Sequence, residues 1–307
     1  MEYKKLGKTD LSVSRIGFGC WAIGGHGYGR VDDKESIRAI KTAIDLGVNF
    51  YDTANVYGFG HSEKLLSKAL GRSRNDVVIA TKGGVNWDDG GNTFRDCSAK
   101  RIVESLEESL RRLKIDCIPL YQIHWPDEKT PISETLEALE RCREAGKIKH
   151  VGCCNFPLEL IREARKSCEL ISTQSLFNLS HRDNEATLGD CSSSMRMSVF
   201  VYGVLARGLF SGKYDSNSEF GEDDTRAKDK DFSGEDLRRN LNIVEALKVL
   251  AEKHNKSPAQ VAIRWVLDLP FVTCALVGAK TAVQVKDNCG SAGWMLDESE
   301  RQSLRLE

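Results

Sequence analysis

Residues 48–57, VNFYDTANVY, begin with a short apolar run that ends in an acid, Asp52, and is followed five residues later by a phenol, Tyr57. Two later apolar runs have the same form: VVIATK ends in Lys82, and CIPLYQIH ends in His124. The carboxyl ends of successive strands in a βα-repeat barrel meet at one rim, where active sites are built. The pattern therefore predicts an acid, a phenol, an amine and an imidazole close together at such a rim.

Strand-like runs alternate with segments of helical periodicity along most of the chain. Ile37, Ile40 and Ile44 mark one apolar stripe at helical spacing, and Ser257-Pro258 has the form of a capped helix start. Alternation of this kind implies a parallel sheet, because parallel neighbours need crossover connections. We count roughly eight such units, the number that closes a (β/α)8 TIM barrel.

The first residues do not follow this alternation. Two short alternating segments surround Gly7-Lys8-Thr9-Asp10 and predict an N-terminal β-hairpin ahead of the first barrel strand. The chain contains neither a tandem repeat nor a linker. We therefore expect an α/β protein in which residues 1–307 form one barrel domain.

Composition narrows the class of protein. The chain has 307 residues, of which 40% are hydrophobic and 29% charged. Its net charge of -1 gives no electrostatic reason to expect a nucleic-acid or membrane partner. It lacks a secretory h-region and any apolar run of about 18 residues. The ten cysteines are scattered and form no CxxC motif, so no metal site is indicated. We expect a cytoplasmic protein with reduced, buried thiols.

Residues 214–235 are polar, highly charged and without periodicity. A connection of this length within a compact domain is usually a functional loop or a disordered one. We interpret it as a mobile excursion over the mouth of the site.

A glycine motif near the start of the chain suggests a different fold. Residues 17–22 (GFGCWA) match the G-x-G-x-x-A fingerprint of Rossmann dinucleotide sites. That motif must open directly into a helix, whereas more glycines follow here and the next helix is expected only near Asp33. We therefore favour a strand that ends in a rim loop.

The four rim residues have a chemistry in common. A nearby ammonium, Lys82, would lower the pKa of the Tyr57 phenol towards the useful range, and Asp52 would hold that amine charged. His124 would orient a substrate oxygen, so the group would protonate a carbonyl whose carbon receives hydride from a nicotinamide. Each residue also has a structural interpretation: an ion pair at the rim, a packed ring, a satisfied imidazole. The residues alone leave the two interpretations equally open.

From about residue 3 to residue 290 the chain resembles the aldo-keto reductase superfamily. The matching stretches occur in family order: GVNFYDTANVYGFGHSE, ATKGG, QIHWPD, VGCCNF, TQSLFNLSHRDNE, VYGVLARGLFSGKY and VGAKTAVQVKDN. The resemblance implies a (β/α)8 barrel whose rim loops close over the cofactor and which reduces aldehydes and ketones with NADPH. It also implies that Asp52, Tyr57, Lys82 and His124 are the catalytic tetrad, with Tyr57 as general acid.

The resemblance further implies a set of cofactor contacts. Cys154, Asn155 and Gln174 would approach the carboxamide, and Phe177 would stack on the nicotinamide ring. The remaining positions would lie along the rest of the dinucleotide, and with Asp52 they complete the predicted set: Gly19, Trp21, Tyr202, Gly203, Leu205, Arg207, Gly208, Lys213, Gly278, Lys280, Thr281, Gln284 and Asn288.

The chain departs from the family pattern at some of these positions. Cys154 stands where Ser is common, Phe177 where Tyr is usual and Val204 where Pro is usual. Lys280 replaces an Arg near the 2'-phosphate, which keeps the charge but loses the bidentate geometry. Binding of NADP(H) is therefore expected, with NAD(H) the weaker alternative.

Other functions fit the same resemblance. An NAD-dependent sugar or alcohol dehydrogenase is one, and a regulatory barrel like the potassium-channel β-subunits is another. Trp21, Tyr28, Trp87 and Trp125 are expected either to flank the pocket mouth, favouring apolar carbonyl substrates, or to pack under rim loops. The sequence holds no signal for the oligomeric state or the physiological substrate.

Overall fold

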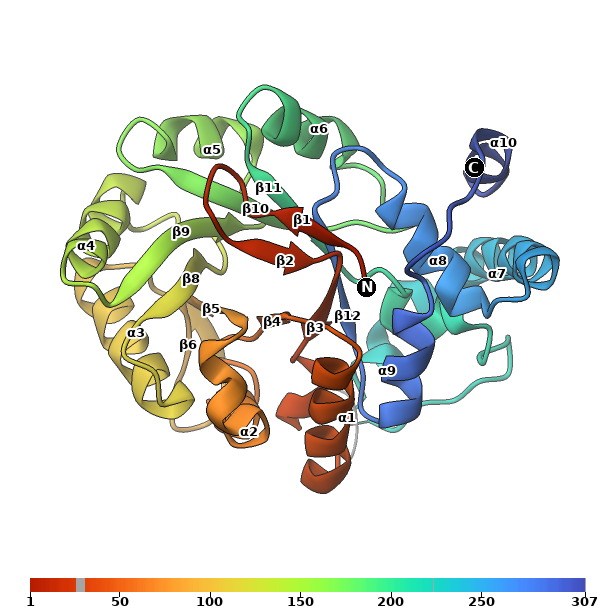
Figure 1. Cartoon of the computed structure of the whole chain (residues 1–307), viewed down its shortest axis with the longest axis horizontal. Helices are drawn as coiled ribbons and strands as arrows, with labels where there is room; N and C mark the ends of the chain where they lie inside the picture. The colour runs from red at the N-terminus through yellow and green to blue at the C-terminus, as the bar shows by residue number, and fades with distance from the viewer. Residues whose placement is uncertain (26–30, 223, 307) are drawn as a thin grey trace.

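The computed structural model of the protein describes residues 1–25, 31–222 and 224–306. Within these residues eight parallel strands close into a barrel, because β12 pairs with β3 as well as with β11 (Figure 1). The barrel strands, in order, are β3 (Ile16–Gly19), β4 (Phe50–Asp52), β5 (Val78–Gly83), β8 (Ile118–Ile123), β9 (Ile148–Cys154), β10 (Leu170–Leu176), β11 (Ser198–Tyr202) and β12 (Cys274–Gly278). The predicted (β/α)8 barrel is confirmed.

Helices surround the barrel (Figure 1). The α-helices are α1 (Asp33–Asp45), α2 (His61–Leu70), α3 (Ala99–Leu113), α4 (Ile132–Glu144), α5 (Leu158–Ala164), α6 (Glu185–Ser193), α7 (Gly234–His254), α8 (Pro258–Leu267), α9 (Ala282–Cys289) and α10 (Glu298–Ser303). Short 3-10 turns are η1 (Ala22–Gly24), η2 (Gly71–Asn75), η3 (Ala206–Ser211), η4 (Thr225–Lys228) and η5 (Lys230–Phe232). α8 begins as its sequence predicts, with a reciprocal capping box between Ser257 and Gln260.

An antiparallel hairpin of β1 (Tyr3–Lys5) and β2 (Ser12–Ser14) confirms the expected N-terminal element. It crosses one end of the barrel in Figure 1. Leu6 and Val13 are fully buried and pack with inward-facing side chains such as Phe50 and Phe200. The hairpin therefore plugs the amino-terminal end of the barrel, which leaves the carboxyl-terminal rim for the site.

The glycine motif ends β3 and leads into η1, while α1 begins at Asp33. Apart from this short 3-10 turn, no helix follows the motif directly in the described residues, so the interpretation as a strand that ends in a rim loop is confirmed. Ile40 of α1 is fully buried, as its place in the predicted stripe requires.

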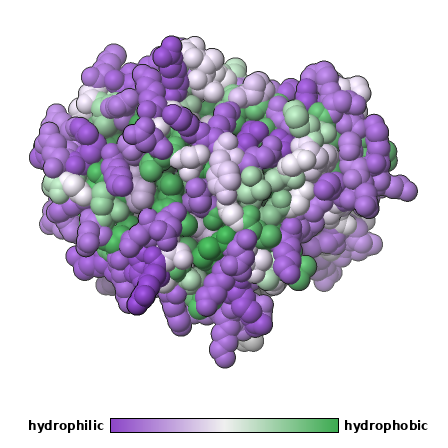
Figure 2. Space-filling view, viewed as in Figure 1, coloured by the Kyte–Doolittle hydropathy of each residue, from purple (hydrophilic) through white to green (hydrophobic). Residues whose placement is uncertain are grey.

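The surface of the molecule is largely polar. Hydrophilic residues cover most of the face in Figure 2, and hydrophobic residues appear in smaller groups between them.

Most of the cysteines are buried and none is paired among the described residues. None of the described helices has the length and apolar character needed to span a membrane.

Two connections extend from the carboxyl-terminal rim. Between β5 and α3, strands β6 (Val85–Trp87) and β7 (Thr93–Arg95) form a small antiparallel hairpin. Between β11 and α7, η3 comes first, and the segment that lacked periodicity, residues 214–235, follows it and contains η4 and η5. Within it the rings of Tyr214, Phe220 and Phe232 pack on one another at steep angles, with centroids 5.0–5.7 Å apart. This cluster gives the segment an ordered centre that its polar composition did not predict.

Candidate active site

Strand register brings the predicted rim residues onto neighbouring strands. Asp52 is the last residue of β4, Lys82 of β5 pairs with Gln122 of β8, and His124 follows β8 directly. The backbone N–H of His124 donates to the carbonyl oxygen of Gly83 at 2.9 Å, which extends the ladder beyond the strand end. These positions are fixed by sheet geometry rather than by loops.

The four predicted side chains meet at one point. The ammonium of Lys82 lies 2.5 Å from Asp52 Oδ2 and donates to the Tyr57 hydroxyl oxygen at 3.3 Å. Its third donor reaches the carbonyl oxygen of Thr53 at 3.0 Å. The His124 ring lies edge-on to the Tyr57 ring, with centroids 5.6 Å apart and an interplanar angle of 80°. The structure therefore assembles a phenol between a buried ammonium and an imidazole.

The pKa of Tyr57 differs from the expectation, whereas Lys82 stays charged as expected. Burial raises the pKa of Tyr57; the charge of Lys82 opposes this rise and Asp52 adds to it. The prediction that Lys82 brings this pKa below its ordinary value is therefore wrong in its net result, although the contribution of Lys82 has the expected sign. Burial also opposes the charged form of Lys82, but the adjacent Asp52 carboxylate outweighs it and raises the pKa of the amine. The phenol keeps its proton and the amine its charge at neutral pH.

His124 is held as a neutral imidazole. Burial lowers its pKa well below the ordinary value, and the charges of Lys82 and Arg95 lower it further. Its Nδ1 is buried and has no hydrogen-bond partner among the described residues. A neutral imidazole carries one N–H, so His124 can donate one hydrogen bond into the site.

A network beneath the site holds Asp52 in place. Its Oδ1 accepts from the Gln122 side-chain amide at 3.1 Å and from the Gln174 amide at 2.9 Å, while its Oδ2 faces Lys82. Gln122 was missed by the sequence reasoning. The sequence did indicate it. Gln122 is a polar residue two places before His124 in an apolar strand, so the two side chains are expected on the same face.

The loop that carries Tyr57 packs directly on the loop that carries Trp21. Their rings are stacked with centroids 6.2 Å apart. The backbones touch because Gly58, at φ 58°, has no side chain: a Cβ there would lie 1.9 Å from the Gly24 carbonyl oxygen. This contact fixes both aromatic rings at the pocket wall.

We expect Gly58→Ala to lower both stability and turnover. A left-handed backbone costs a non-glycine residue about 1–2 kcal/mol, and the steric overlap should add about 1–3 kcal/mol. Gly146→Ala is the matched control, because Gly146 has φ 74° and nothing within 4 Å of a built Cβ. Urea unfolding and kcat measure the two effects. Equal stability losses, with turnover unchanged in both variants, would contradict the packing argument.

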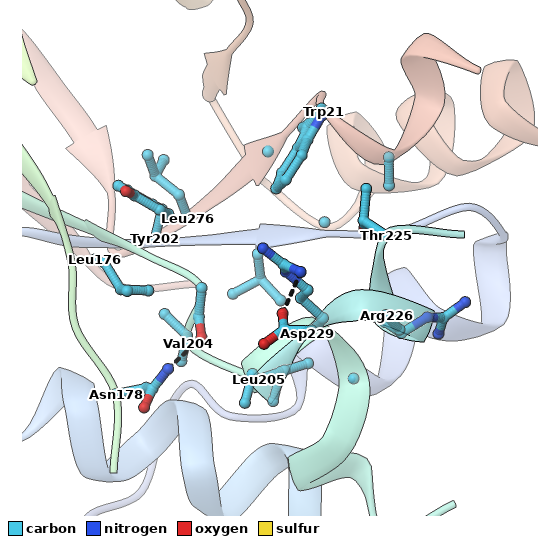
Figure 3. A pocket seen from close by; sticks show the side chains of 18 of the residues that line it. Trp21, Leu176, Asn178, Tyr202, Val204, Leu205, Thr225, Arg226, Asp229 and Leu276 are labelled. Carbon is cyan, nitrogen blue, oxygen red and sulfur yellow. Dashed lines mark hydrogen bonds and ion pairs between the residues drawn. The ribbon is translucent and has the colours of Figure 1, made fainter. Parts of the chain in front are cut away.

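A cavity of about 1120 Å³ runs from these residues along the rim to α9. Most of the predicted cofactor positions line it, and Figure 3 shows labelled members such as Trp21, Tyr202 and Leu205 around it. The predicted residues that line it are Gly19, Trp21, Asp52, Asn155, Gln174, Tyr202, Gly203, Leu205, Arg207, Gly208, Lys213, Gly278, Lys280, Gln284 and Asn288.

Three predicted contacts do not line the cavity. Phe177 is fully buried and stacks on Trp265 at an interplanar angle of 7°, so its assignment as the ring-stacking residue is corrected. Cys154 is fully buried at the end of β9. Thr281 caps α9 by accepting a hydrogen bond from the Gln284 backbone. Of the predicted mouth aromatics, Trp87 packs on Phe59, and Tyr28 lies outside the described residues.

Tyr202 presents the aromatic face that was expected of Phe177. Its hydroxyl group donates to Asn155 Oδ1 at 2.9 Å, and burial raises its pKa to about 12. Asn155, held at φ 60°, also donates from its side-chain amide to the His124 carbonyl oxygen at 3.1 Å. The two side-chain hydrogen bonds of Asn155 thereby connect the ends of β8 and β11 beside the site.

Cationic side chains gather at the far end of the cavity. Burial lowers the pKa of Lys280, the charges of Arg226 and Lys213 lower it further, and Asp224 opposes them. Lys280 precedes α9, where its backbone N–H donates to the Gln284 side chain at 2.7 Å. Positive charge close to a helix N-terminus suits an anionic group. Arg226 was not predicted from the sequence.

The segment between β11 and α7 is tied to both sides of the cavity. Arg207 of η3 forms an ion pair with Asp229, and its guanidinium carbon lies 6.0 Å from the centre of the Trp21 ring. Figure 3 shows Trp21 and Asp229 on opposite sides of the pocket, with a dashed line at the Asp229 carboxylate. Nearby, the His181 ring lies 2.9 Å from an Asp231 oxygen. These contacts place the segment over the cavity, as predicted, but the sequence did not indicate which residues would pair.

The geometry agrees with comparisons to known proteins. The model of the Aldo/keto reductase family matches residues 15–305. The chain belongs to this family. It is 38% identical over 307 residues to the aldo-keto reductase YhdN of Bacillus subtilis, covering 99% of this chain and 92% of the relative. A solved glycerol dehydrogenase of Gluconobacter oxydans is 38% identical, with a TM-score of 0.91, and the match covers 98% of this chain and 93% of that one.

Relatives differ in the activities their names state. The chain is 31% identical to an NADH-specific methylglyoxal reductase of Escherichia coli, across 98% of its own length and 96% of the relative. The aldo-keto reductases are oxidoreductases that use nicotinamide cofactors and act on small carbonyl compounds. The protein is therefore an oxidoreductase of this family.

Proposed function

We propose that the protein reduces an aldehyde or ketone to the alcohol with NADPH, with Tyr57 as the general acid. One observation carries the proposal: the Tyr57 hydroxyl lies 3.3 Å from the Lys82 ammonium, beside the His124 ring, in the wall of a cavity of about 1120 Å³. No cluster of His, Cys, Asp and Glu among the described residues has the form of a metal site.

The side chains act in a defined order. A bound reduced nicotinamide supplies the hydride. The neutral His124 donates a hydrogen bond to the carbonyl oxygen and orients it, and Tyr57 gives that oxygen its proton. The Lys82 ammonium then stabilises the buried phenolate that remains, and Asp52 keeps the amine charged in its low-dielectric surroundings. In the oxidative direction Tyr57 takes the proton back.

The residues fit a phosphorylated dinucleotide. Asn155 and Gln174 offer amide groups near the catalytic end, and Tyr202 offers an aromatic face. Lys280, Arg226 and Lys213 would receive the anionic end. Arg226 also lines this end of the cavity, where the Asp224 carboxylate and the Tyr214 hydroxyl hold its guanidinium.

Dissociation constants for NADPH and NADH test the cofactor assignment. We expect NADPH to bind at least about tenfold more tightly, because an extra phosphate meets clustered cations. Protein fluorescence quenching on titration measures both. Equal or tighter NADH binding would contradict the assignment.

Oxidation of a polyol is the second candidate, favoured by the similarity to the glycerol dehydrogenase. The same tetrad would serve, with Tyr57 as base. Comparing kcat/KM for carbonyl reduction and for glycerol oxidation at neutral pH distinguishes the two directions.

We expect Asp229→Asn to speed cofactor exchange. Without the carboxylate, Arg207 loses its ion pair across the cavity and the segment over it opens more often. Dissociation of NADPH should accelerate roughly threefold to tenfold, as fits the loss of one partly exposed ion pair. Stopped-flow fluorescence measures the rate. Asp215→Asn is the control, because the hydrogen bonds of Asp215 to described residues stay within its own turn. An unchanged dissociation rate in Asp229→Asn would show that this ion pair does not hold the cofactor.

A further inference from the structure

The substrate end of the cavity is largely apolar, and in the part of the chain that the structure describes no acid lines it beside Tyr57 and His124. After strands β4, β5 and β8, the residues that line it beside Tyr57 and His124 are Val56, Gly58, Phe59, Val85, Thr93 and Trp125. The acids among the lining residues stand elsewhere: Asp52 lies beneath the site, bonded to Lys82, and the others belong to the segment after β11, to α7 and to α9.

Among the described residues, Arg95 places a cation at this rim. The guanidinium carbon of Arg95, the last residue of β7, lies 4.7 Å from the centre of the Trp125 ring. Trp125 follows His124 directly, and Thr93, two residues before Arg95 on the same strand, also lines the cavity. Alternate residues of a strand face the same side, so Arg95 shares the cavity side of the hairpin with Thr93. Arg95 therefore lies beside the mouth of the catalytic end.

Arg95 has no carboxylate partner among the described residues. One of its terminal nitrogens donates to the Pro126 carbonyl oxygen at 3.4 Å, and the remaining N–H groups of its exposed side chain stay available. The neighbouring acids bond to other groups. Asp127 accepts from Cys97, Lys129 and Thr130, and Asp96 accepts from the Ser98 backbone.

The Trp125 stack restrains this guanidinium in orientation. Cation–π packing holds it at the rim without neutralising its charge. Its field reaches the catalytic end: burial, then the charge of Lys82, then that of Arg95 lower the pKa of His124. An uncompensated, restrained guanidinium beside an apolar cavity is suited to a carboxylate, which matches its planar donors.

We propose that Arg95 is a specificity-determining residue that recognises the carboxylate of an anionic carbonyl substrate with an aromatic or hydrocarbon body. The carbonyl would lie at Tyr57 and His124, the apolar body against Trp21, Val56 and Trp125, and the carboxylate at the rim. This inference rests on the proposed function, because it names the substrate class of the same site.

A matched substrate pair tests this assignment. 4-Carboxybenzaldehyde and its methyl ester differ by one charge and present the same aldehyde. We expect wild-type kcat/KM to be about tenfold higher for the acid, as one charge-assisted contact at an exposed rim allows. Arg95→Gln should abolish that preference, mainly through KM, and Arg95→Lys should restore part of it. Raising the salt concentration should lower the preference of the wild type alone.

Arg111→Gln is the control variant. Arg111 is an exposed arginine of α3 that does not line the catalytic cavity, so its loss should leave the preference intact. If the wild type shows no preference for the acid, or if Arg95→Gln lowers kcat/KM equally for acid and ester, the inference is overturned. The proposed function is judged separately, by reduction of the ester: an enzyme that reduces the ester without discrimination keeps its proposed function and loses only this inference.

Discussion

Tyr57→Phe should bind NADPH with nearly wild-type affinity and lose most of its turnover. The variant removes one hydroxyl group, and Lys82 keeps its contacts with Asp52 and the Thr53 carbonyl oxygen, so the rim stays assembled. Loss of a general acid costs about 10²–10⁴-fold in rate. Steady-state kcat with a reactive aldehyde, together with the NADPH dissociation constant, measures both parts of the expectation.

Tyr51→Phe is the matched control for this variant. Tyr51 lies on β4, the strand that leads into the loop carrying Tyr57; it is fully buried and donates its hydroxyl to the Val48 carbonyl oxygen at 3.0 Å. Its replacement should cost about 1 kcal/mol of stability and leave kcat unchanged. Turnover of Tyr57→Phe within a factor of two of wild type would reject the role assigned to the phenol.

Lys82→Met should lose turnover about as severely, by roughly 10²-fold or more, because no positive charge would then stabilise the phenolate formed at Tyr57. It should also lose stability. Lys82 is fully buried and Asp52 nearly so, and removal of one partner of a buried ion pair typically costs about 3–5 kcal/mol. Urea unfolding and kcat measured on one preparation report the two losses.

Combining Lys82→Met with Asp52→Asn separates catalysis from folding. The second change removes the unpaired carboxylate, so the double variant should regain much of the stability and none of the turnover. Recovery of both would mean that Lys82 acts only by holding the fold.

The fold and the meeting of the rim side chains were predictable because the periodicity of the strands fixes where side chains at their ends lie. Asp52, Lys82 and His124 stand at the ends of neighbouring strands, so a parallel barrel must bring them together. Gln122 follows from the same rule, applied two residues earlier. Local sequence pattern was sufficient at these positions because sheet register transmits it directly into space.

The error at Phe177 came from the family resemblance, and strand periodicity could not have corrected it. β10 stops at Leu176, and the chain then turns Phe177 into the core against Trp265, while Tyr202 at the end of β11 faces the cavity. The direction of a side chain just beyond a strand depends on the loop that follows, which strand alternation does not specify.

Contacts between residues around the cavity could not be predicted from the sequence, for a related reason. Asp229 and Arg226 lie in a segment without periodicity, and Arg95 in a hairpin inserted between β5 and α3. Asp229 pairs with Arg207, Arg226 lies close enough to Lys280 to lower its pKa, and Arg95 packs on Trp125; these neighbours are brought near by long-range packing. The charge balance at Tyr57 likewise depended on burial, which residue type alone does not provide.

A single-turnover experiment tests most directly whether Tyr57 supplies the proton beside Lys82. Enzyme preloaded with NADPH is mixed with excess aldehyde in H₂O and in D₂O, and the loss of nicotinamide absorbance is followed for the wild type and Tyr57→Phe. The wild type should react quickly and more slowly in D₂O, and the variant should be slower by about 10²–10⁴-fold. A variant that reacts at the wild-type rate, with the same sensitivity to D₂O, would show that the proton comes from another group.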